Sequence, residues 1–316
     1  MYILQNRAGN ESEVINGSQV LWCFGVPTNL LVEDPTNSII LIAFNTLTSV
    51  TALLGNFMVL ITLWRTPSLH SPSNTLLCGL ALSGLCIGFL SGPINVGFNI
   101  MRLRNSVHLK SCALMNTIIL FTTYLTPITL CTLTAMSIDR YLALHLHLRY
   151  EQVVTERKTT GLLILVWFFS GLYPLISSLD EKPVTSSLIA STIAICLLAV
   201  SFTWIKIYQV VRRHQAQIQD QMNAQAQQFN MAKFKKSAVN ALFILLLHLV
   251  CFLPLLVAKI ALAVRVNRLN VRILNFTYIL VFLNSSLNPL VYCWRQRDLR
   301  AAVKETVKKL CCCRKR

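Results

Sequence analysis

The sequence predicts an all-α membrane protein: a seven-transmembrane helix bundle followed by a short amphipathic eighth helix. Of its 316 residues, 54% are hydrophobic and only 13% are charged, whereas soluble domains carry about 25% charged residues. Seven stretches are long and apolar enough to cross a bilayer, which takes about 20 mostly apolar residues. The net charge of +17 would suggest nucleic-acid binding in a soluble protein, but in so apolar a chain it is typical of basic residues gathered at one membrane face. Disordered proteins, collagen, disulfide-rich scaffolds and cytosolic enzymes fit this composition poorly.

The elements are expected in a simple order, without an internal repeat of the transporter type. Residues 1–37 form a polar, acidic N-terminal tail that lacks the basic and then apolar pattern of a cleaved signal peptide. Residues 38–293 form the seven-span domain, and 294–316 form an amphipathic helix and a cytoplasmic tail. In the short fourth span, Gly171 and Pro174 predict a kink. The predicted spans are 39–64, 74–99, 113–138, 161–178, 187–210, 237–258 and 272–293.

The distribution of basic residues predicts the orientation in the membrane. If the N-terminus is extracellular, most of the 29 Lys and Arg residues fall on the cytoplasmic side, as the positive-inside rule favours. Glycosylation sequons at Asn10 and Asn16 agree with this orientation. We therefore expect a multi-pass plasma membrane protein with an extracellular N-terminus.

The 11 cysteines do not form a disulfide framework. Six lie in predicted spans, where cysteine behaves as a small apolar residue, and three lie in the basic tail. Only Cys23 and Cys112 are expected on the oxidising side of the membrane. Whether these two pair is left open.

Several motifs occur inside the spans in a fixed order. The motifs are Gly55-Asn56, Asp139-Arg140-Tyr141, Trp167, Tyr208, Cys251-Phe252-Leu253-Pro254 and Asn288-Pro289-Leu290-Val291-Tyr292. A single three-letter motif would be weak, but an ordered set on seven spans is specific. Their order resembles that of the rhodopsin-like (class A) G-protein-coupled receptors, and the resemblance extends over about residues 38–313.

The resemblance implies roles for these residues in G-protein coupling. Asp139 and Arg140 can neutralise one another, and activation would free the arginine to meet the G protein. Pro254 and Pro289 interrupt the backbone hydrogen bonding of their helices and would let the helix halves swing. The resemblance also implies that Tyr208 and Tyr292 turn inward to support the open state. The candidate coupling and switch residues are Asp139, Arg140, Tyr141, Tyr208, Phe252, Pro254, Asn288, Pro289 and Tyr292.

Residues 295–310 carry apolar side chains at spacings of four, four and three, which predicts a helix in the headgroup plane. It resembles the eighth helix of the family, so that Cys311, Cys312 and Cys313 resemble palmitoylation sites. The alternative is a solvated basic tail.

The sequence departs from the family at several positions. Gly84 replaces the aspartate that binds sodium in the family, so no sodium site is expected. His248 replaces a phenylalanine and either reaches toward Asn284 or Asn288 or bonds to a neighbouring backbone group. Phe234 replaces the acidic partner of the motif arginine, which suggests a weakly restrained inactive state with basal signalling.

Two further departures, Val200 in place of a proline and a second outer loop without cysteine (about 179–186), resemble melanocortin, cannabinoid, lysophospholipid and adenosine receptors. They involve the absence of motifs and do not choose among these receptors.

The resemblance also places a ligand cavity. Thr122 replaces the counter-ion of amine receptors and Phe282 replaces the lysine that would bind retinal, so neither ligand is expected. Basic residues around the outer mouth could steer an acidic ligand, a lipid phosphate or a peptide carboxylate, or form a solvated rim. This basic rim consists of Arg102, Arg104, Lys110, Lys259, Arg265, Arg268 and Arg272. The candidate ligand-binding residues are Thr122, Thr123, Thr126, Lys259, Tyr278 and Phe282.

No catalytic constellation, metal-binding spacing or cofactor motif occurs, so no enzyme activity and no cofactor are expected. The predicted function is a receptor that transmits binding of an extracellular ligand to a cytoplasmic heterotrimeric G protein by helix rearrangement. Its partners would be that G protein, an extracellular ligand whose identity the sequence does not give and which could be acidic or a lipid, and membrane lipid, but no nucleic acid. The alternatives are a seven-span solute transporter or channel, and a receptor-like scaffold without signalling.

Overall fold

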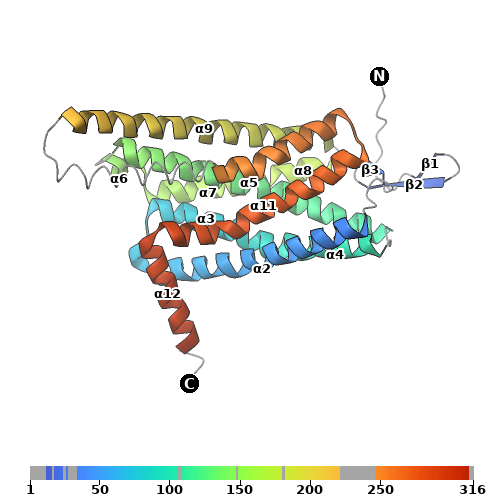
Figure 1. The fold of residues 1–316 in the computed structure, drawn as a ribbon, viewed down its shortest axis with the longest axis horizontal. Coiled ribbons are helices and arrows are strands. Elements are labelled where there is room, and N and C mark those ends of the chain that lie inside the picture. Colours follow the sequence, from blue (N-terminus) through green and yellow to red (C-terminus); the bar gives the residue numbers. More distant parts are fainter. Residues whose placement is uncertain are drawn as a thin grey trace.

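The computed structural model describes residues 12–15, 18–23, 26–27, 34–104, 109–146, 149–179, 182–220 and 246–312. Seven helices within these ranges are long and apolar enough to cross a membrane, which confirms the predicted fold class. They run along the long axis of the molecule (Figure 1). In chain order they are α2 (Pro35–Arg65), α3 to α4 (Pro72–Leu103), α5 (Leu109–Leu146), α7 and α8 (Glu156–Ser170 and Leu172–Ser178), α9 (Lys182–Asp220), the sixth span (Leu246–Val264) and α11 (Arg268–Arg295).

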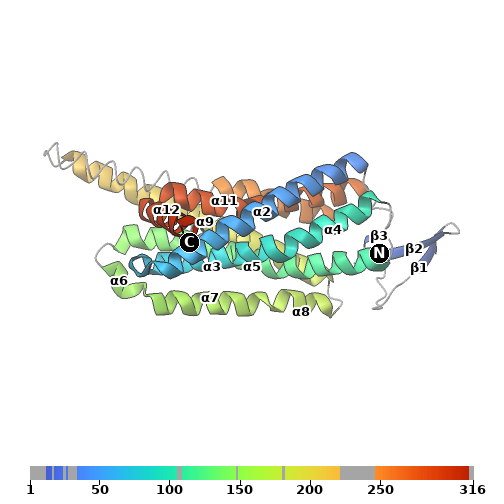
Figure 2. The same cartoon turned by 90° about the horizontal axis from the view of Figure 1, so that it is seen from below.

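The bundle has two distinct ends. At one end, here called the strand end, three short antiparallel strands lie beyond the helices (Figures 1 and 2). At the other, the α12 end, the chain leaves the bundle as α12 (Arg297–Cys312). The strands were not expected in the polar tail; they are β1 (Ser12–Ile15), β2 (Ser18–Cys23) and β3 (Val26–Pro27).

The second span contains a turn that the sequence did not predict. Between α3 (Pro72–Cys86) and α4 (Gly92–Leu103), residues Ile87–Ser91 form a π-helical turn. The hydroxyl of Ser49 in α2 donates a 2.6 Å hydrogen bond to the carbonyl of Gly88. A Cβ atom on Gly88 would lie 2.7 Å from the backbone nitrogen of Leu53, so only glycine permits this approach of the two helices. Pro93, which cannot donate a backbone hydrogen bond, follows the turn and helps to explain the altered ladder.

The fourth span is interrupted where the sequence predicted a kink. Helix α7 ends at Ser170 and α8 begins at Leu172, with Gly171 between them. Pro289 lies inside α11, which continues past it. A Cβ atom on Gly55 of α2 would be 3.0 Å from the Pro289 side chain, so α2 packs closely on this proline.

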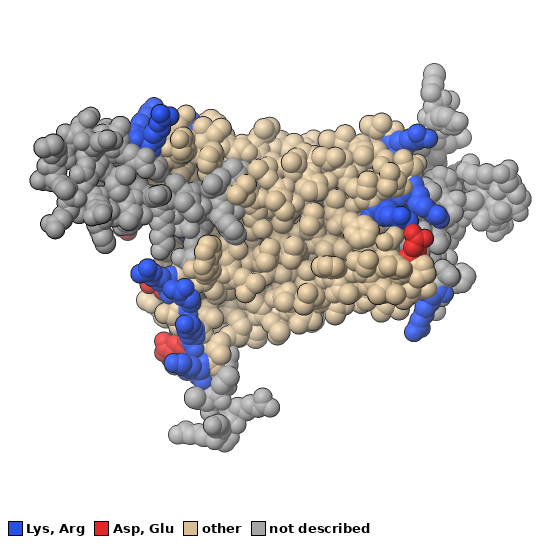
Figure 3. All heavy atoms as spheres, viewed as in Figure 1, with Lys and Arg blue, Asp and Glu red and all other residues tan. Residues whose placement is uncertain are grey.

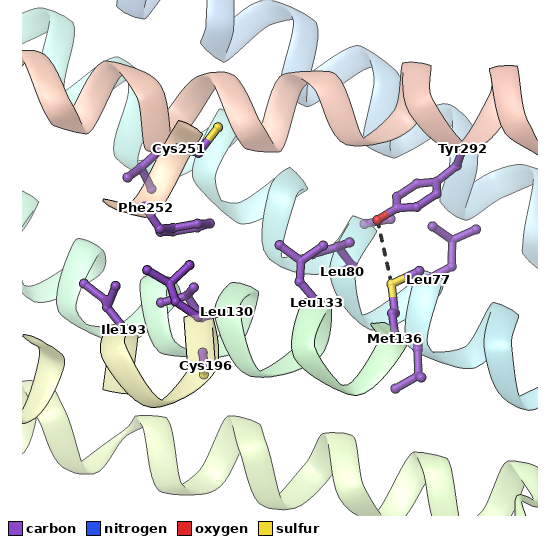
Figure 4. Packing of buried hydrophobic residues seen from close by; sticks show 14 of the residues in the cluster. Leu77, Leu80, Leu130, Leu133, Met136, Ile193, Cys196, Cys251, Phe252 and Tyr292 are labelled. Carbon is purple, nitrogen blue, oxygen red and sulfur yellow. Dashed lines mark hydrogen bonds between the residues drawn. The ribbon is translucent and has the colours of Figure 1, made fainter. Parts of the chain in front are cut away.

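A hydrophobic core joins the spans from the inside. Phe252 of the sixth span is fully buried and lies in one cluster with Leu130, Leu133 and Met136 of α5 and Tyr292 of α11 (Figure 4). The outer faces of the helices instead expose large apolar side chains. On the face drawn in Figure 3, Lys, Arg, Asp and Glu gather at the two ends and leave an uncharged band between them. Such a band matches the hydrocarbon layer of a bilayer.

Helix α12 confirms the predicted amphipathic segment and leaves the bundle at a steep angle (Figure 1). Leu299 is buried and Val303 packs against the core cluster, so the first turns of the apolar face rest on the bundle. Val307, further along, is 41% exposed. The Lys309 Nζ atom and the Glu305 Oε1 atom form an exposed ion pair at 2.7 Å.

Candidate functional site

A hydrogen-bonded polar centre lies at the α12 end of the bundle around Asp139. This carboxylate is 3% exposed. The Ser73 hydroxyl donates to its Oδ2 atom at 2.6 Å, and the Tyr150 hydroxyl donates to its Oδ1 atom at 2.5 Å. Because Ser73 lies in the first turn of α3 and Tyr150 begins α6 (Tyr150–Val153), one carboxylate joins three elements. Buried carboxylates need such donors.

These contacts correct the expectation that Asp139 and Arg140 neutralise one another. Both carboxylate oxygens are satisfied by hydroxyl groups, and within the described ranges no ion pair forms between the two residues. Arg140 is partly exposed, and Tyr141 stacks on His145 with ring centroids 5.4 Å apart. Asp139 therefore does not depend on the motif arginine for its hydrogen bonds.

Local sequence explains the position of the two hydroxyl donors. Ser71 caps α3 by accepting a hydrogen bond from the Asn74 backbone, and Pro72 occupies the first helical position, which fixes Ser73 in the first turn. Burial, followed by the hydrogen bond to Asp139, raises the pKa of Tyr150 to about 12. The phenol therefore stays protonated at physiological pH and remains a donor.

Replacing Tyr150 with phenylalanine is expected to destabilise the protein by about 1–2 kcal/mol, because Asp139 loses one of its two donors. Since the raised pKa of Tyr150 favours the protonated phenol, its contribution is complete below pH 10 and is lost as the pH rises through about 12. Thermal unfolding of the two detergent-purified proteins should therefore show the same difference in melting temperature, between the original protein and the Tyr150→Phe variant, at every pH from 7 to 9.

Tyr141→Phe is the matched control, because its described contact is ring stacking, which phenylalanine retains. Equal melting temperatures for the Tyr150→Phe and Tyr141→Phe variants would contradict the role of the Tyr150 hydroxyl.

A second group of predicted switch residues lies beside this centre. Tyr292 of α11 is 4% exposed, and its hydroxyl contacts the Met136 sulfur of α5 at 3.7 Å (Figure 4). Met136 lies one helical turn before Arg140, so the contact links α11 to the motif helix. Asn288 and Pro289 are buried on the same helix, and Pro254 is partly buried on the sixth span. The predicted residues of α5, α11 and the sixth span thus contribute to one interior.

Tyr208 is an exception, because its predicted inward direction is wrong for this structure. The side chain is 50% exposed and stacks on Trp204, one turn earlier on α9, with ring centroids 5.7 Å apart. The two aromatic rings share an outer face of the helix because residues four apart do so.

The hypothesis that His248 bonds to Asn284 is also not supported. Both side-chain atoms of Asn284 lack a hydrogen-bond partner among the described residues, although the residue is fully buried. His248 is buried and lies against Phe252, with ring centroids 6.0 Å apart.

The polar region around Gly84 does not fit a sodium site that depends on a carboxylate. The Asn56 amide donates to the carbonyls of Ala52 and Ser285, at 2.7 and 3.1 Å. A Cβ atom on Gly84 would lie 2.6 Å from the Asn56 nitrogen, so the Asn56 side chain fills the space that a larger residue would need. Thr129, nearby, donates to Ser83 at 3.3 Å. These side chains are all neutral and would not compensate a buried cation.

The candidate ligand residues are placed on three helices but are not joined into one site by the described contacts. Thr122, Thr123 and Thr126 are buried on α5. Phe282 packs in a separate apolar cluster with Leu125 and Ile128 of α5. Tyr278 is partly buried against the main core, and Lys259 makes no hydrogen bond or ion pair with any residue that the structure describes.

Two residues of the expected basic rim are held in specific contacts. Arg102 is 3% exposed, lies over the Phe98 ring and donates to Asn99 at 3.4 Å. Arg272 of α11 forms a 2.9 Å ion pair with Asp34, which precedes α2. These two basic residues are therefore not part of a freely solvated rim.

Some predicted sites lie outside the described residues. These are the sequons at Asn10 and Asn16, Cys313, and the side chains of Cys23, Cys112, Cys311 and Cys312. Sequence reasoning in turn missed Ser73, Tyr150 and Met136, because only folding brings these common residue types to the motif.

Comparison with known proteins adds an independent line of information. The model of the family described as 7 transmembrane receptor (rhodopsin family) matches residues 55–186. Adenosine receptor A2b of Gallus gallus is 25% identical, over 84% of this chain and 87% of that receptor. Melanocortin receptor 4 of Danio rerio is 24% identical, over 83% and 81%, and melanocortin receptor 5 of Homo sapiens is 25% identical, over 84% and 82%. These relatives are receptors and not enzymes, as the sequence led us to expect.

Proposed function

We propose that this chain, which is similar to the rhodopsin-like seven-transmembrane receptors, transmits the binding of an extracellular ligand to a cytoplasmic heterotrimeric G protein. A ligand would act by shifting an existing equilibrium between helix arrangements. The chain is a multi-pass plasma membrane protein that takes part in signal transduction and is not an enzyme.

The arrangement at the α12 end is the observation that carries this proposal. Asp139 is satisfied by Ser73 and Tyr150, so the neighbouring Arg140 is not required to neutralise it. Arg140 lies one turn from Met136, which contacts Tyr292. A movement of α11 against α5 would therefore alter the surroundings of a partly exposed arginine at the end of the bundle. A receptor needs such a coupling between helix movement and the surface that binds its partner, whereas a static scaffold does not need it.

The proposed orientation places the strand end outside and the α12 end in the cytoplasm. The basic residues of α12 and the loops near it support this placement through the positive-inside rule. They would also face anionic lipid and the G protein. Glycosylation at Asn10 and Asn16 and palmitoylation at Cys311 to Cys313 belong to the same proposal.

The proposed ligand is acidic or a lipid, because the basic residue Arg265 is exposed at the strand end. Relatives named as adenosine and as melanocortin receptors match at similar identity. Their names therefore do not select one ligand class for this chain.

A solute transporter or channel is the second candidate, and the described spans offer it little support. Their acidic side chains, such as Asp139 and Glu156, lie near the helix ends, and the apolar interior provides no charged path.

The experiment that tests the proposal measures nucleotide exchange on purified G proteins. Receptor in lipid nanodiscs is combined with heterotrimers of each Gα class, with and without a library of acidic and lipid compounds. We expect GTPγS binding to rise with receptor dose without ligand, because Phe234 and Gly84 leave out two restraints of the inactive state that the family uses. Exchange that stays at the level of empty nanodiscs for every class and compound would overturn the proposal, and solute uptake by the same preparation would favour the transporter.

A further inference from the structure

We propose that the outer face of α9 binds a phosphorylated inositol lipid at the cytoplasmic surface of the membrane. Four side chains, here called the α9 stripe, contact this lipid: Phe202, Lys206, Gln209 and Arg213. The proposal goes beyond coupling to a G protein. It rests on the proposed function only for the orientation, which puts the α12 end of the bundle in the cytoplasm.

The four residues share one outward face of α9. Spacings of four, three and four residues bring them to the same side of an α-helix. Phe202 is 61% exposed. Gln209 and Arg213 are also exposed, and Lys206 is partly buried. Ile207, by contrast, is buried, and α9 packs against α5. The α9 stripe is therefore open to the surrounding lipid.

Lys206 places a charge inside a membrane span. It is the only charged residue of the fifth span, Val184–Val210, and it lies about one helical turn before the end of that span. Its Nζ atom lies 5.2 Å from the centroid of the Phe202 ring, and it forms no ion pair with any residue that the structure describes. A cation–π contact compensates a charge only in part, and a cation in hydrocarbon is costly without an anionic or aqueous partner. An anionic lipid supplies that partner.

Aromatic rings place this part of α9 at the surface of the membrane. Trp204 and Tyr208 stack with ring centroids 5.7 Å apart, and Tyr208 is 50% exposed. Trp and Tyr side chains gather where hydrocarbon meets headgroups. Phe202 comes before this pair along the helix, and Arg213 comes after it, where α9 reaches past the neighbouring spans (Figures 1 and 2). Phe202 thus lies at the level of the acyl chains and Arg213 at the level of the headgroups.

The end of α9 has an excess of positive charge. Arg212 and Arg213 are exposed, and α9 contains no Asp or Glu before its last residue, Asp220. Among the described residues, neither arginine has an ion-pair partner. Clusters of basic residues next to a span attract the anionic lipids of the inner leaflet. Charge therefore selects an anionic lipid over a neutral one.

The order of the side chains selects a lipid that carries phosphate at two depths. Lys206, assisted by the Gln209 amide, binds the phosphodiester that joins the headgroup to the glycerol. Arg213 lies about 10 Å further along the helix axis, where it meets a phosphate on the inositol ring. A guanidinium can bind such a phosphate through two parallel hydrogen bonds. Phosphatidylserine has no second phosphate for this arginine.

The apolar part of the α9 stripe distinguishes the lipid from a soluble inositol phosphate. Phe202 and the neighbouring Ile205 are 61% and 47% exposed. Acyl chains cover these side chains, whereas a free headgroup leaves them uncovered. The occupant is therefore the intact lipid.

Native mass spectrometry of the full-length, detergent-purified receptor tests the lipid. The receptor is mixed with equal amounts of phosphatidylinositol bisphosphate and phosphatidylserine. We expect the bisphosphate adduct to exceed the phosphatidylserine adduct by about fivefold, because Arg213 gains one charged contact. Equal adducts would overturn the proposal. Glycerophosphoinositol bisphosphate, the same headgroup without acyl chains, should leave the lipid bound at equal concentration, and displacement of the lipid would overturn its assignment as the occupant.

Glutamine variants test the α9 stripe. Lys206→Gln and Arg213→Gln should each lower the affinity for phosphatidylinositol bisphosphate by about fivefold, because each removes one charged contact. Arg212→Gln is the matched control, since it removes the same charge from the adjacent residue, which lies off the stripe, and it should bind as the original protein does. Equal losses for the Arg212 and Arg213 variants would reveal general attraction to a basic helix end and overturn the proposal. Arg213 is exposed beyond the span, so its variant decides the test even where Lys206→Gln lowers stability.

This outcome is separable from the proposed function. Lipid adducts are counted without a G protein or a ligand. Loss of the lipid preference with nucleotide exchange intact would overturn the lipid site alone. A preserved preference without any exchange would support the lipid site and overturn the proposed function alone.

Discussion

Replacing Arg140 with alanine is expected to reduce G-protein activation by about 30-fold or more, equivalent to about 2 kcal/mol, while the receptor still folds. The loss follows from removing a partly exposed guanidinium at the end of the bundle, where a partner protein would bind it. Folding should survive because Asp139 keeps its hydrogen bonds from Ser73 and Tyr150 without the arginine. An arginine that neutralised a buried acid would behave differently, since its removal would leave that acid unpaired.

The measurement is nucleotide exchange at matched numbers of surface receptors. Arg149→Ala is the control, because Arg149 is an exposed arginine at the same end of the bundle, where it precedes α6. Both variants should reach the surface, and only the Arg140 variant should lose exchange. Equal activity of the two variants would show that Arg140 has no special part in coupling, whereas failure of the Arg140 variant to fold would contradict the independence of Asp139.

Gly88→Ala should have the largest effect on folding, with the amount of correctly folded receptor falling about tenfold. The added Cβ atom would lie 2.7 Å from the Leu53 nitrogen and 2.9 Å from the Ser49 carbonyl oxygen, so it meets backbone that cannot rotate away. Overpacking of this kind costs about 1–3 kcal/mol even where side chains can adjust. The hydrogen bond from Ser49 to the Gly88 carbonyl would be strained as well.

Gly97→Ala is the matched control, because a Cβ atom on Gly97 meets no atom within 4 Å. Gly79→Ala should fall between the two, since its Cβ atom would meet the flexible end of the Leu163 side chain. The number of receptors at the cell surface and the melting temperature in detergent should both be highest for the Gly97 variant, lower for the Gly79 variant and lowest for the Gly88 variant. The same loss in all three would mean that helix content, and not the contact between α2 and the π-helical turn, decides folding.

The fold was predictable from sequence to a large extent because a bilayer imposes length and hydropathy on each span separately. The break at Gly171 was predictable for a similar reason, since glycine and proline act locally. The turn at Ile87–Ser91 was not, because it depends on Ser49 in another helix. The three strands were missed because short strands in a polar segment carry little hydropathic signal.

The candidate site was predictable in its motifs but not in its contacts. Asp139 and Tyr292 were found by their neighbours in sequence, whereas Ser73 and Met136 reach them through the packing of separate helices. A motif also fixes a position without fixing a direction, which is why the inward turn predicted for Tyr208 was wrong. Of the partners predicted for His248, Asn284 is excluded, because matching polarity does not ensure contact.

The contact between Asn56 and Gly84 makes these two positions depend on one another in any mutational path. An acidic residue at position 84 cannot simply be restored, because the Asn56 amide occupies the space beside the Gly84 backbone. Shortening Asn56 first would release its bond to the Ser285 carbonyl and leave a void between α2 and α11. The substitution at Gly84 and the shortening of Asn56 are each unfavourable when made alone. Such sign epistasis would keep the receptor in its carboxylate-free form.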